Sequence, residues 1–277
     1  MTNASDGHCM TKELLIIALV AAVSLNCRAA EMYFAKIVNN QYQLNINGEV
    51  IGGDYDRLIT LIKSSPVIYV KSIFLALDSP GGSVDEAIKI ANFVENSAML
   101  VRVNEEAICA SSCFYIYVSG QMRAGAGSIQ IHRPFINNAA IKDMQVNEAR
   151  KYQNESINKV RSFLMIKSVP SELIDKMMNL SSTESYKLSV PELRSIGFSS
   201  IPFEEASIAK CGESPDKYFT NALTEVELNC IKNLMTITRI ESLNSILGKK
   251  KSREVFREYL LSIGGLEQSD GRILLDK

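Results

Sequence analysis

The sequence predicts an α/β fold with mainly parallel strands, because strand-like and helix-like segments alternate along the chain. Residues 73–77 (IFLAL) form a continuous apolar run, which is typical of a strand buried on both faces. Ser83 and Glu86 then form an S-x-x-E capping box, which indicates that a helix begins there. Residues 99–103 and 129–132 are further apolar segments of strand length. This succession of strand, helix and strand is typical of a parallel sheet.

The segments around this centre follow from the same patterns. Residues 32–38 and 42–46 have β-rich, alternating patterns and predict two strands, and residues 54–63 carry apolar side chains at helical spacing. Residues 111–119 are almost entirely apolar after two serines and predict a short buried helix. Amphipathic helices are expected after the last strand at residues 141–167, 171–178 and 188–196.

The end of the chain has a different character. Residues 211–215 predict a turn, residues 218–247 are helical and polar, and the basic run 249–251 is expected in the link to a last helix. We therefore expect an α/β domain at residues 30–204 and a C-terminal helical extension at residues 205–277.

Composition and charge exclude several classes of protein. The chain has 277 residues, of which 46% are apolar and 22% charged, so an extensively disordered chain is excluded. The 30 Lys and Arg residues are balanced by 31 Asp and Glu residues. This balance provides no general basic field for binding nucleic acid or an anionic membrane, and we expect no nucleic-acid partner.

The N-terminus predicts an export signal. Residues 14–25 (LLIIALVAAVSL) form an uncharged apolar run after Lys12, which is too short to span a bilayer and fits the core of a signal peptide. Small residues at the predicted cleavage site favour removal of residues 1–29, and an uncleaved membrane anchor is the alternative. The translation start is Met1 or Met10. We expect the protein to be periplasmic or secreted.

Export also bears on the cysteines, because thiols tend to pair in an oxidising compartment. Of the six cysteines, Cys109, Cys113, Cys211 and Cys230 remain after the predicted cleavage. Three full pairings are possible, and the two local pairs, Cys109–Cys113 and Cys211–Cys230, are the most economical. The alternative for Cys109-x3-Cys113 is a metal site, but no further His or Cys lies nearby in the sequence, and no metal is expected.

Candidate catalytic residues are concentrated between residues 78 and 134. The motifs are D-S-P-G-G at 78–82, C-A-S-S-C at 109–113, Ser119-Gly120 with Arg123, and I-H-R-P at 131–134. A serine nucleophile needs an adjacent base, and His132 is the one histidine left after the predicted cleavage. A Gly-Gly pair and a serine at a helix start can present backbone N–H groups to a developing oxyanion. These are the components of a serine hydrolase without a cofactor.

In these ordered motifs the sequence resembles the Clp-type serine peptidase superfamily, which shares the crotonase-like fold of stacked ββα units. The resemblance covers roughly residues 43–200 and is strongest for the exported bacterial members of that group. It implies that Ser111 is the nucleophile and His132 the base. It also implies an oxyanion hole at Gly81, Gly82 and the N–H of Ser112.

The third member of the expected triad departs from the family pattern. In the Clp protease subunit an Asp precedes the segment that Leu188-Ser-Val-Pro-Glu192 matches, and that position is Ser185 here. Glu184 is its neighbour, and Asp175 lies upstream. Three alternatives remain open: Glu184 orients His132, the site is a Ser–His dyad, or the triad is broken.

The cysteines of the C-A-S-S-C motif are a second departure from the intracellular Clp subunits. A disulfide between Cys109 and Cys113 would pin the turn that carries the nucleophile. The alternative is that both are buried, small apolar residues.

The resemblance implies an exported serine hydrolase, and specifically an endopeptidase acting on peptides or proteins. A non-catalytic Clp-fold module that binds a peptide or a partner protein is the alternative, and a crotonase-like acyl-thioester enzyme is a third reading. By analogy with the family we expect a homo-oligomer with residues 141–167 at the interface. No ATP-driven unfoldase partner is expected, because the chain has no P-loop and leaves the cytoplasm.

Overall fold

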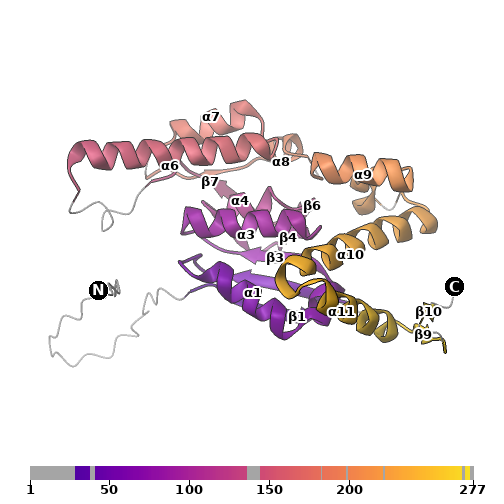
Figure 1. The fold of residues 1–277 in the computed structure, drawn as a ribbon. Helices are drawn as coiled ribbons and strands as arrows, with labels where there is room; N and C mark the ends of the chain where they lie inside the picture. The colour runs from indigo at the N-terminus through magenta and orange to yellow at the C-terminus, as the bar shows by residue number, and fades with distance from the viewer. Residues whose placement is uncertain are drawn as a thin grey trace, which may run out of the picture.

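The structure is a computed structural model, and Figure 1 shows how its helices and strands are arranged. It describes residues 29–37, 41–135, 144–181, 183–197, 199–220, 222–269 and 272–274. The predicted signal peptide, up to residue 28, lies outside the described residues, as do positions 141–143 of the expected long helix. Within the described ranges, every helix is too short or too polar to cross a membrane.

Two sheets form the centre of the molecule. The larger sheet has the strand order β1-β2-β3-β4-β6, and the smaller one has the order β5-β7-β8. All neighbours pair in parallel except β1 with β2 and β7 with β8. The larger sheet comprises β1 (Glu31–Lys36), β2 (Tyr42–Asn47), β3 (Ser72–Asp78), β4 (Leu100–Val103) and β6 (Met122–Gly125), and the smaller one β5 (Ile108–Ala110), β7 (Ser128–Ile131) and β8 (Tyr186–Lys187). The predicted α/β fold with mainly parallel strands is confirmed.

Helices cover these sheets in the order that the sequence predicts. The structure adds one helix that the sequence did not predict, α2. Ser83 caps α3 by accepting a hydrogen bond from the Glu86 amide, so the capping box predicted this helix start correctly. The predicted helix at 111–119 is shorter than expected, because α4 begins only at Cys113. The helices of this part are α1 (Asp54–Ser64), α2 (Pro66–Lys71), α3 (Val84–Asn96), α4 (Cys113–Tyr117), α6 (Val146–Ile166), α7 (Ser171–Asn179) and α8 (Val190–Ser195).

The core lies mainly between the larger sheet and the helices α1 and α3. On β2, Leu44 and Ile46 point into this core, while Gln43 and Asn45 alternate with them and bond to each other on the opposite face. A second apolar cluster involves Leu100 on β4. In this cluster the C-terminal helices pack against the sheet through Phe203, Leu234 and Met235.

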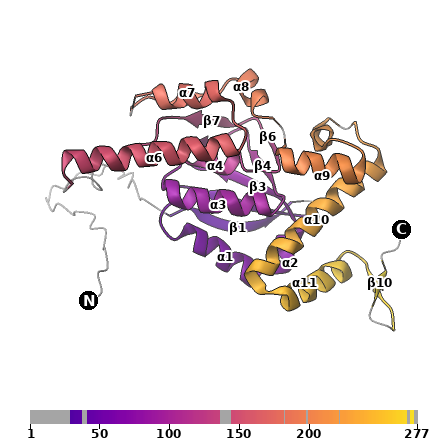
Figure 2. The ribbon, with the colours of Figure 1, turned by 45° about the horizontal axis from the view of Figure 1, so that its top comes forward.

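The C-terminal helices lie together at one side of the sheets, as Figures 1 and 2 show from two directions. The side chain of Arg239 is fully buried and donates hydrogen bonds to the carbonyls of Val70 and Ala98, which ties α10 to the first part of the chain. The elements are α9 (Ile201–Cys211), the 3-10 helix η1 (Pro215–Phe219), α10 (Glu225–Leu247), α11 (Lys249–Ser262), β9 (Leu266–Glu267) and β10 (Ile273–Leu274).

Three expectations for this region were wrong. The helix expected at residues 218–247 begins only at Glu225, after the 3-10 helix η1. The sequence indicated no helix at α9, where Phe203 is buried but Ile201 and Ile208 are exposed, so the apolar residues form no single stripe. The basic run 249–251 is not a link but the first turn of α11, because Gly248 both ends α10 and begins the next helix.

Candidate active site

Ser111 and His132 lie at the same end of the smaller sheet, where the carboxyl ends of its parallel strands meet. Strands β5 and β7 are parallel neighbours, with Ala110 opposite Gln130. Ser111 follows β5 directly, and His132 follows β7 directly. The Ser111 amide donates a 3.1 Å hydrogen bond to the Gln130 carbonyl, which continues the ladder by one step. Because the carboxyl ends of parallel strands share one edge, the two residues that the motifs single out are juxtaposed.

Ser111 occupies a strained turn between β5 and α4. Its φ angle is +57°, in the left-handed region that residues with a side chain rarely adopt. Such conformations cost about 1–3 kcal/mol and are concentrated at functional sites. Ser111 is half-buried, whereas Ser112 is fully buried and its hydroxyl has no hydrogen-bond partner in the described part of the chain. The accessible hydroxyl of the pair is therefore that of Ser111.

A disulfide closes this turn. Cys109 and Cys113 are bonded, with their Cα atoms 5.2 Å apart, and both side chains are fully buried. The second local pair, Cys211–Cys230, is also bonded. The two pairings favoured by the sequence are thus confirmed.

Gly81 packs directly against the same turn, whereas the neighbouring Gly82 packs against Val50. Gly81 and Gly82 have φ angles of +96° and +137°. The Gly81 amide donates a 3.1 Å hydrogen bond to the Ser79 hydroxyl. Among the described residues, in contrast, neither the Gly82 amide nor the Ser112 amide donates a hydrogen bond.

Replacing Gly81 with Ala tests how closely the loop that contains Gly81 packs against the turn that contains Ser111. A Cβ atom on Gly81 lies 2.5 Å from the Ser111 Cβ and 2.6 Å from the Ala110 carbonyl oxygen, and the φ angle disfavours any side chain. We expect Gly81→Ala to lower the free energy of unfolding by about 1–3 kcal/mol, as overpacking typically does. Denaturant unfolding measures this change, with Gly52→Ala, whose Cβ meets nothing within 4 Å, as the control. Equal stability of the two variants would contradict the close fit.

The His132 ring is held by a backbone carbonyl. Its Nδ1 atom lies 2.8 Å from the carbonyl oxygen of Arg133, and its ring centroid lies 5.3 Å from that of Phe135. A carbonyl oxygen only accepts hydrogen bonds, so Nδ1 carries the proton and Nε2 is left as the acceptor. Within the described residues no hydrogen bond joins His132 to Ser111. This is common before substrate binds, because catalytic hydrogen bonds often tighten only in the complex.

The carboxylates considered as a third member of the triad have other partners. Glu184 is exposed and accepts a 2.8 Å hydrogen bond from the Ser181 amide; this bond and one from the Ser181 side chain lower the pKa of Glu184. Asp175 is 2.7 Å from Arg161 in an ion pair.

Ser185 lies beside His132 in the register of the smaller sheet. Strand β8 pairs Tyr186 with Ile131, so the next step of the antiparallel register places Ser185 opposite His132. The Ser185 hydroxyl donates a 3.0 Å hydrogen bond to the side chain of Gln130. The structure thus brings a serine, and not a carboxylate, to the strand beside His132.

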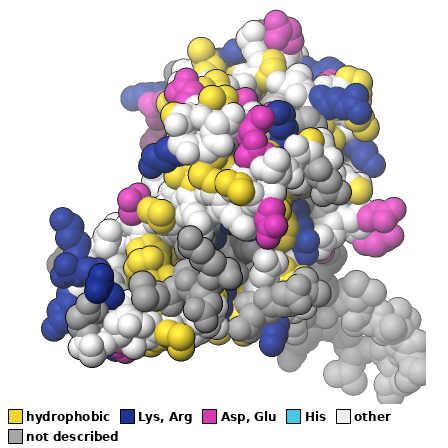
Figure 3. Space-filling view, turned by 90° about the vertical axis from the view of Figure 1, so that its right-hand side faces the viewer, with side chains coloured by type: hydrophobic (Ala, Val, Ile, Leu, Met, Phe, Trp, Pro, Cys, Tyr) yellow, Lys and Arg dark blue, Asp and Glu magenta, His cyan; other side chains and the backbone are white. Residues whose placement is uncertain are grey.

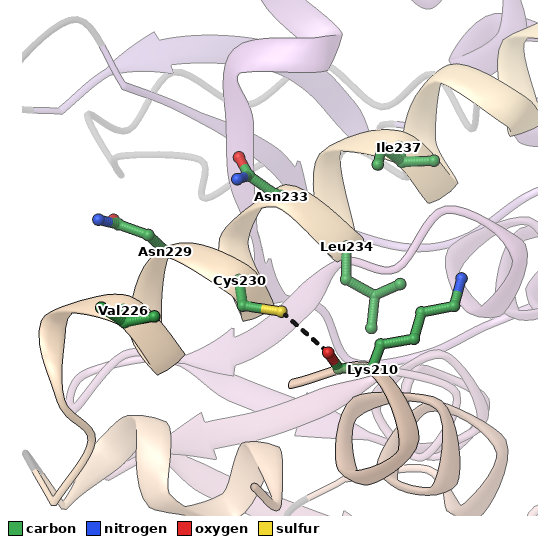
Figure 4. Close-up of a pocket in the computed structure, with 7 residues that line it drawn as sticks. All are labelled: Lys210, Val226, Asn229, Cys230, Asn233, Leu234 and Ile237. Carbon is green, nitrogen blue, oxygen red and sulfur yellow. Dashed lines mark hydrogen bonds between the residues drawn. The ribbon is translucent and has the colours of Figure 1, made fainter. Parts of the chain in front are cut away.

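The described part of the chain also has a pocket on the C-terminal helices. It has a volume of about 500 Å³ and lies along α10 beside the end of α9, with Lys210 opposite Cys230 and Leu234 (Figure 4). Its lining holds neither a serine nor a histidine. The molecular face that includes these helices mixes apolar, basic and acidic side chains (Figure 3). Serine–histidine chemistry is therefore not supported in this pocket.

The chain is similar to solved structures at sequence identities of 18% to 21%. No protein-family model matches the chain, and no curated protein matches its sequence. Among solved structures, ClpP1 from Listeria monocytogenes is 18% identical, with 57% of this chain and 88% of that chain covered and a TM-score of 0.41. A mutant of the 1510-N membrane-bound stomatin-specific protease is 21% identical, with 56% and 75% covered and a TM-score of 0.38.

Proposed function

We propose that this protein is an exported serine hydrolase, and specifically an endopeptidase, whose nucleophile is Ser111 and whose base is His132. The observation that carries the proposal is the strained Ser111 turn at the end of β5, beside the strand that ends at His132. A half-buried serine in the left-handed region is a costly conformation of the kind that is concentrated at functional sites.

The proposed reaction is acyl transfer to the serine followed by hydrolysis. The Ser111 Oγ atom attacks the carbonyl carbon of a peptide bond while His132 Nε2 takes its proton. The Gly82 and Ser112 amides donate to the resulting oxyanion. The carbon–nitrogen bond then breaks as His132 returns the proton to the leaving amine. Water repeats the sequence with the acyl-enzyme, which releases the acid and restores Ser111.

Of the three alternatives for the triad, the contacts support a Ser–His dyad. The Arg133 carbonyl accepts from Nδ1 and so fixes the tautomer, which is one of the tasks of the triad carboxylate. It supplies no full negative charge to stabilise the imidazolium. A dyad of this kind is expected to be slower than a complete triad.

Installing the missing carboxylate tests this assignment. In Ser185→Asp the new side chain lies on the strand beside His132, where a carboxylate stabilises the imidazolium. Losing such a carboxylate costs about 10⁴ in kcat, so we expect at least a tenfold gain in the rate of labelling by a fluorophosphonate probe. Ser185→Asn is the uncharged control. An equal rate in both variants would show that a charge at this position does not act on His132.

Two further features support the proposal. The two disulfides are typical of proteins from an oxidising compartment, in line with export into the periplasm or the medium. At its C-terminal end helix α6 exposes the neighbouring Met165 and Ile166, with exposed fractions of 63% and 76%, and we place the homo-oligomer interface there. We propose peptides or proteins as substrates.

The test is covalent labelling of the folded protein, with both disulfides intact, by a fluorophosphonate probe. Tandem mass spectrometry locates the adduct. The proposal predicts one adduct, on Ser111. A folded protein that stays unlabelled, or that is labelled at another residue, would contradict it. The absence of labelling would instead favour a non-catalytic module that binds peptides or a partner, because Ser185 takes the position of the triad carboxylate.

A further inference from the structure

We propose that the Cys109–Cys113 disulfide is a positioning element of the active site, which holds the Ser111 hydroxyl and the Ser112 amide in their reactive arrangement. The inference rests on the proposed function and adds two positioning residues to it. It separates the roles of the two disulfides: one sets the geometry of the site, and the other stabilises the fold.

The first argument is what the disulfide encloses. Cys109 lies within β5, and Cys113 is the first residue of α4. The enclosed residues include Ser111 and Ser112, the proposed nucleophile and an oxyanion donor. The crosslink therefore fixes the distance between the strand end and the helix start, and the reactive groups lie between these two points.

The second argument is the conformation of the enclosed turn. A left-handed, non-glycine residue persists only where its surroundings over-determine it. The Ser111 amide bonds to Gln130, and the Ser111 carbonyl accepts a 3.0 Å hydrogen bond from Phe114. On the side toward α4, the turn is held by the packing of this five-residue helix, whose side chains are all buried in the core. The disulfide adds a covalent restraint on that side, which links the turn directly to the strand end.

The third argument is the contrast with the other disulfide. Cys109 and Cys113 are 4 positions apart in the sequence, whereas Cys211 and Cys230 are 19 apart. A crosslink removes more entropy from the unfolded chain when it closes a longer loop. The Cys211–Cys230 bond therefore contributes more to global stability, although it joins α9 to α10, which carry none of the proposed catalytic groups. Stability and reactivity are thus expected to depend on different disulfides.

The test compares two double variants with the wild type. Cys109→Ala/Cys113→Ala removes the crosslink at the turn, and Cys211→Ala/Cys230→Ala is the matched control. For each, the labelling rate is measured against the concentration of a fluorophosphonate probe, well below the melting temperature. This yields the maximal rate constant and the half-saturating concentration separately. The melting temperature is recorded by circular dichroism.

We expect the maximal rate constant to fall at least tenfold in Cys109→Ala/Cys113→Ala, with the half-saturating concentration changed less than twofold. The control is expected to keep the wild-type rate constant and to show the larger fall in melting temperature. A purely structural disulfide would lower the melting temperature without changing the rate constant of the folded protein.

An unchanged rate constant in folded Cys109→Ala/Cys113→Ala would overturn the positioning role while leaving the proposed function intact. An unlabelled wild type would instead overturn the proposed function, and this inference with it. A second pair, Cys109→Ala/Cys113→Val, fills the buried volume and is measured in parallel. Failure of both pairs to fold would also overturn the inference, because the crosslink would then be a determinant of the whole fold.

Discussion

Replacing Ser111 with Ala is expected to abolish labelling by a fluorophosphonate probe, whereas replacing Ser112 with Ala is not. The two serines are neighbours in one turn, but only Ser111 is exposed enough to meet a reagent. The Ser112 side chain is fully buried and unpartnered within the described residues, and its proposed role uses the backbone amide, which Ala retains. Loss of a serine nucleophile removes covalent chemistry altogether, so we expect a decrease of at least about 10³-fold in Ser111→Ala.

The same pair of variants separates chemistry from stability. A buried hydroxyl without a partner costs about 1–3 kcal/mol of desolvation, so Ser112→Ala is expected to be as stable as the wild type or more stable. The labelling rate is measured by gel fluorescence, and the free energy of unfolding by denaturant titration. Labelling of Ser111→Ala at the wild-type rate would contradict the assignment of Ser111 as the nucleophile. Loss of labelling in Ser112→Ala alone would assign that role to Ser112.

Most of the fold was predictable because its signals are local. The apolar run that became β3 and the S-x-x-E motif at Ser83 each depend on a few adjacent residues, and the structure has the predicted strand and helix start. Helix α9 was missed because its environment is not local: Phe203 packs on the far end of the larger sheet, so burial on this helix does not follow a single stripe. Tertiary contacts of this kind leave no periodic pattern in the sequence.

The candidate site was predictable to the level of residue types. The motifs indicated a serine at a helix start and a histidine at a strand end, and the structure brings Ser111 and His132 to one end of the smaller sheet. The partner of the imidazole was not predictable, because the Arg133 carbonyl is a main-chain group with no residue-type signature. The hydrogen bond from the Ser181 amide to Glu184 could not be predicted from the sequence for the same reason. Main-chain hydrogen bonding is thus the basis on which we propose a Ser–His dyad among the three triad alternatives.

Replacing His132 with Gln is expected to lower the labelling rate by roughly 10²–10⁴-fold, the usual contribution of a positioned general base. Glutamine retains a polar side chain of similar reach but does not take a proton from the Ser111 hydroxyl at neutral pH. The bond from the Ser111 amide to Gln130 involves backbone atoms and is not altered, so the turn is expected to keep its conformation. The melting temperature checks that the variant is folded.

A second variant, His132→Ala, distinguishes loss of the base from loss of packing. His132 is half-buried, so added imidazole can reach the space that its ring leaves, and it is expected to restore part of the labelling in His132→Ala but not in Ser111→Ala. Wild-type rates in both His132 variants would show that the serine is activated by another group. The chain has two histidines, and His8 precedes the predicted cleavage site, so no second imidazole of the exported chain can replace the lost base. The loss on replacing His132 therefore measures the contribution of this one side chain.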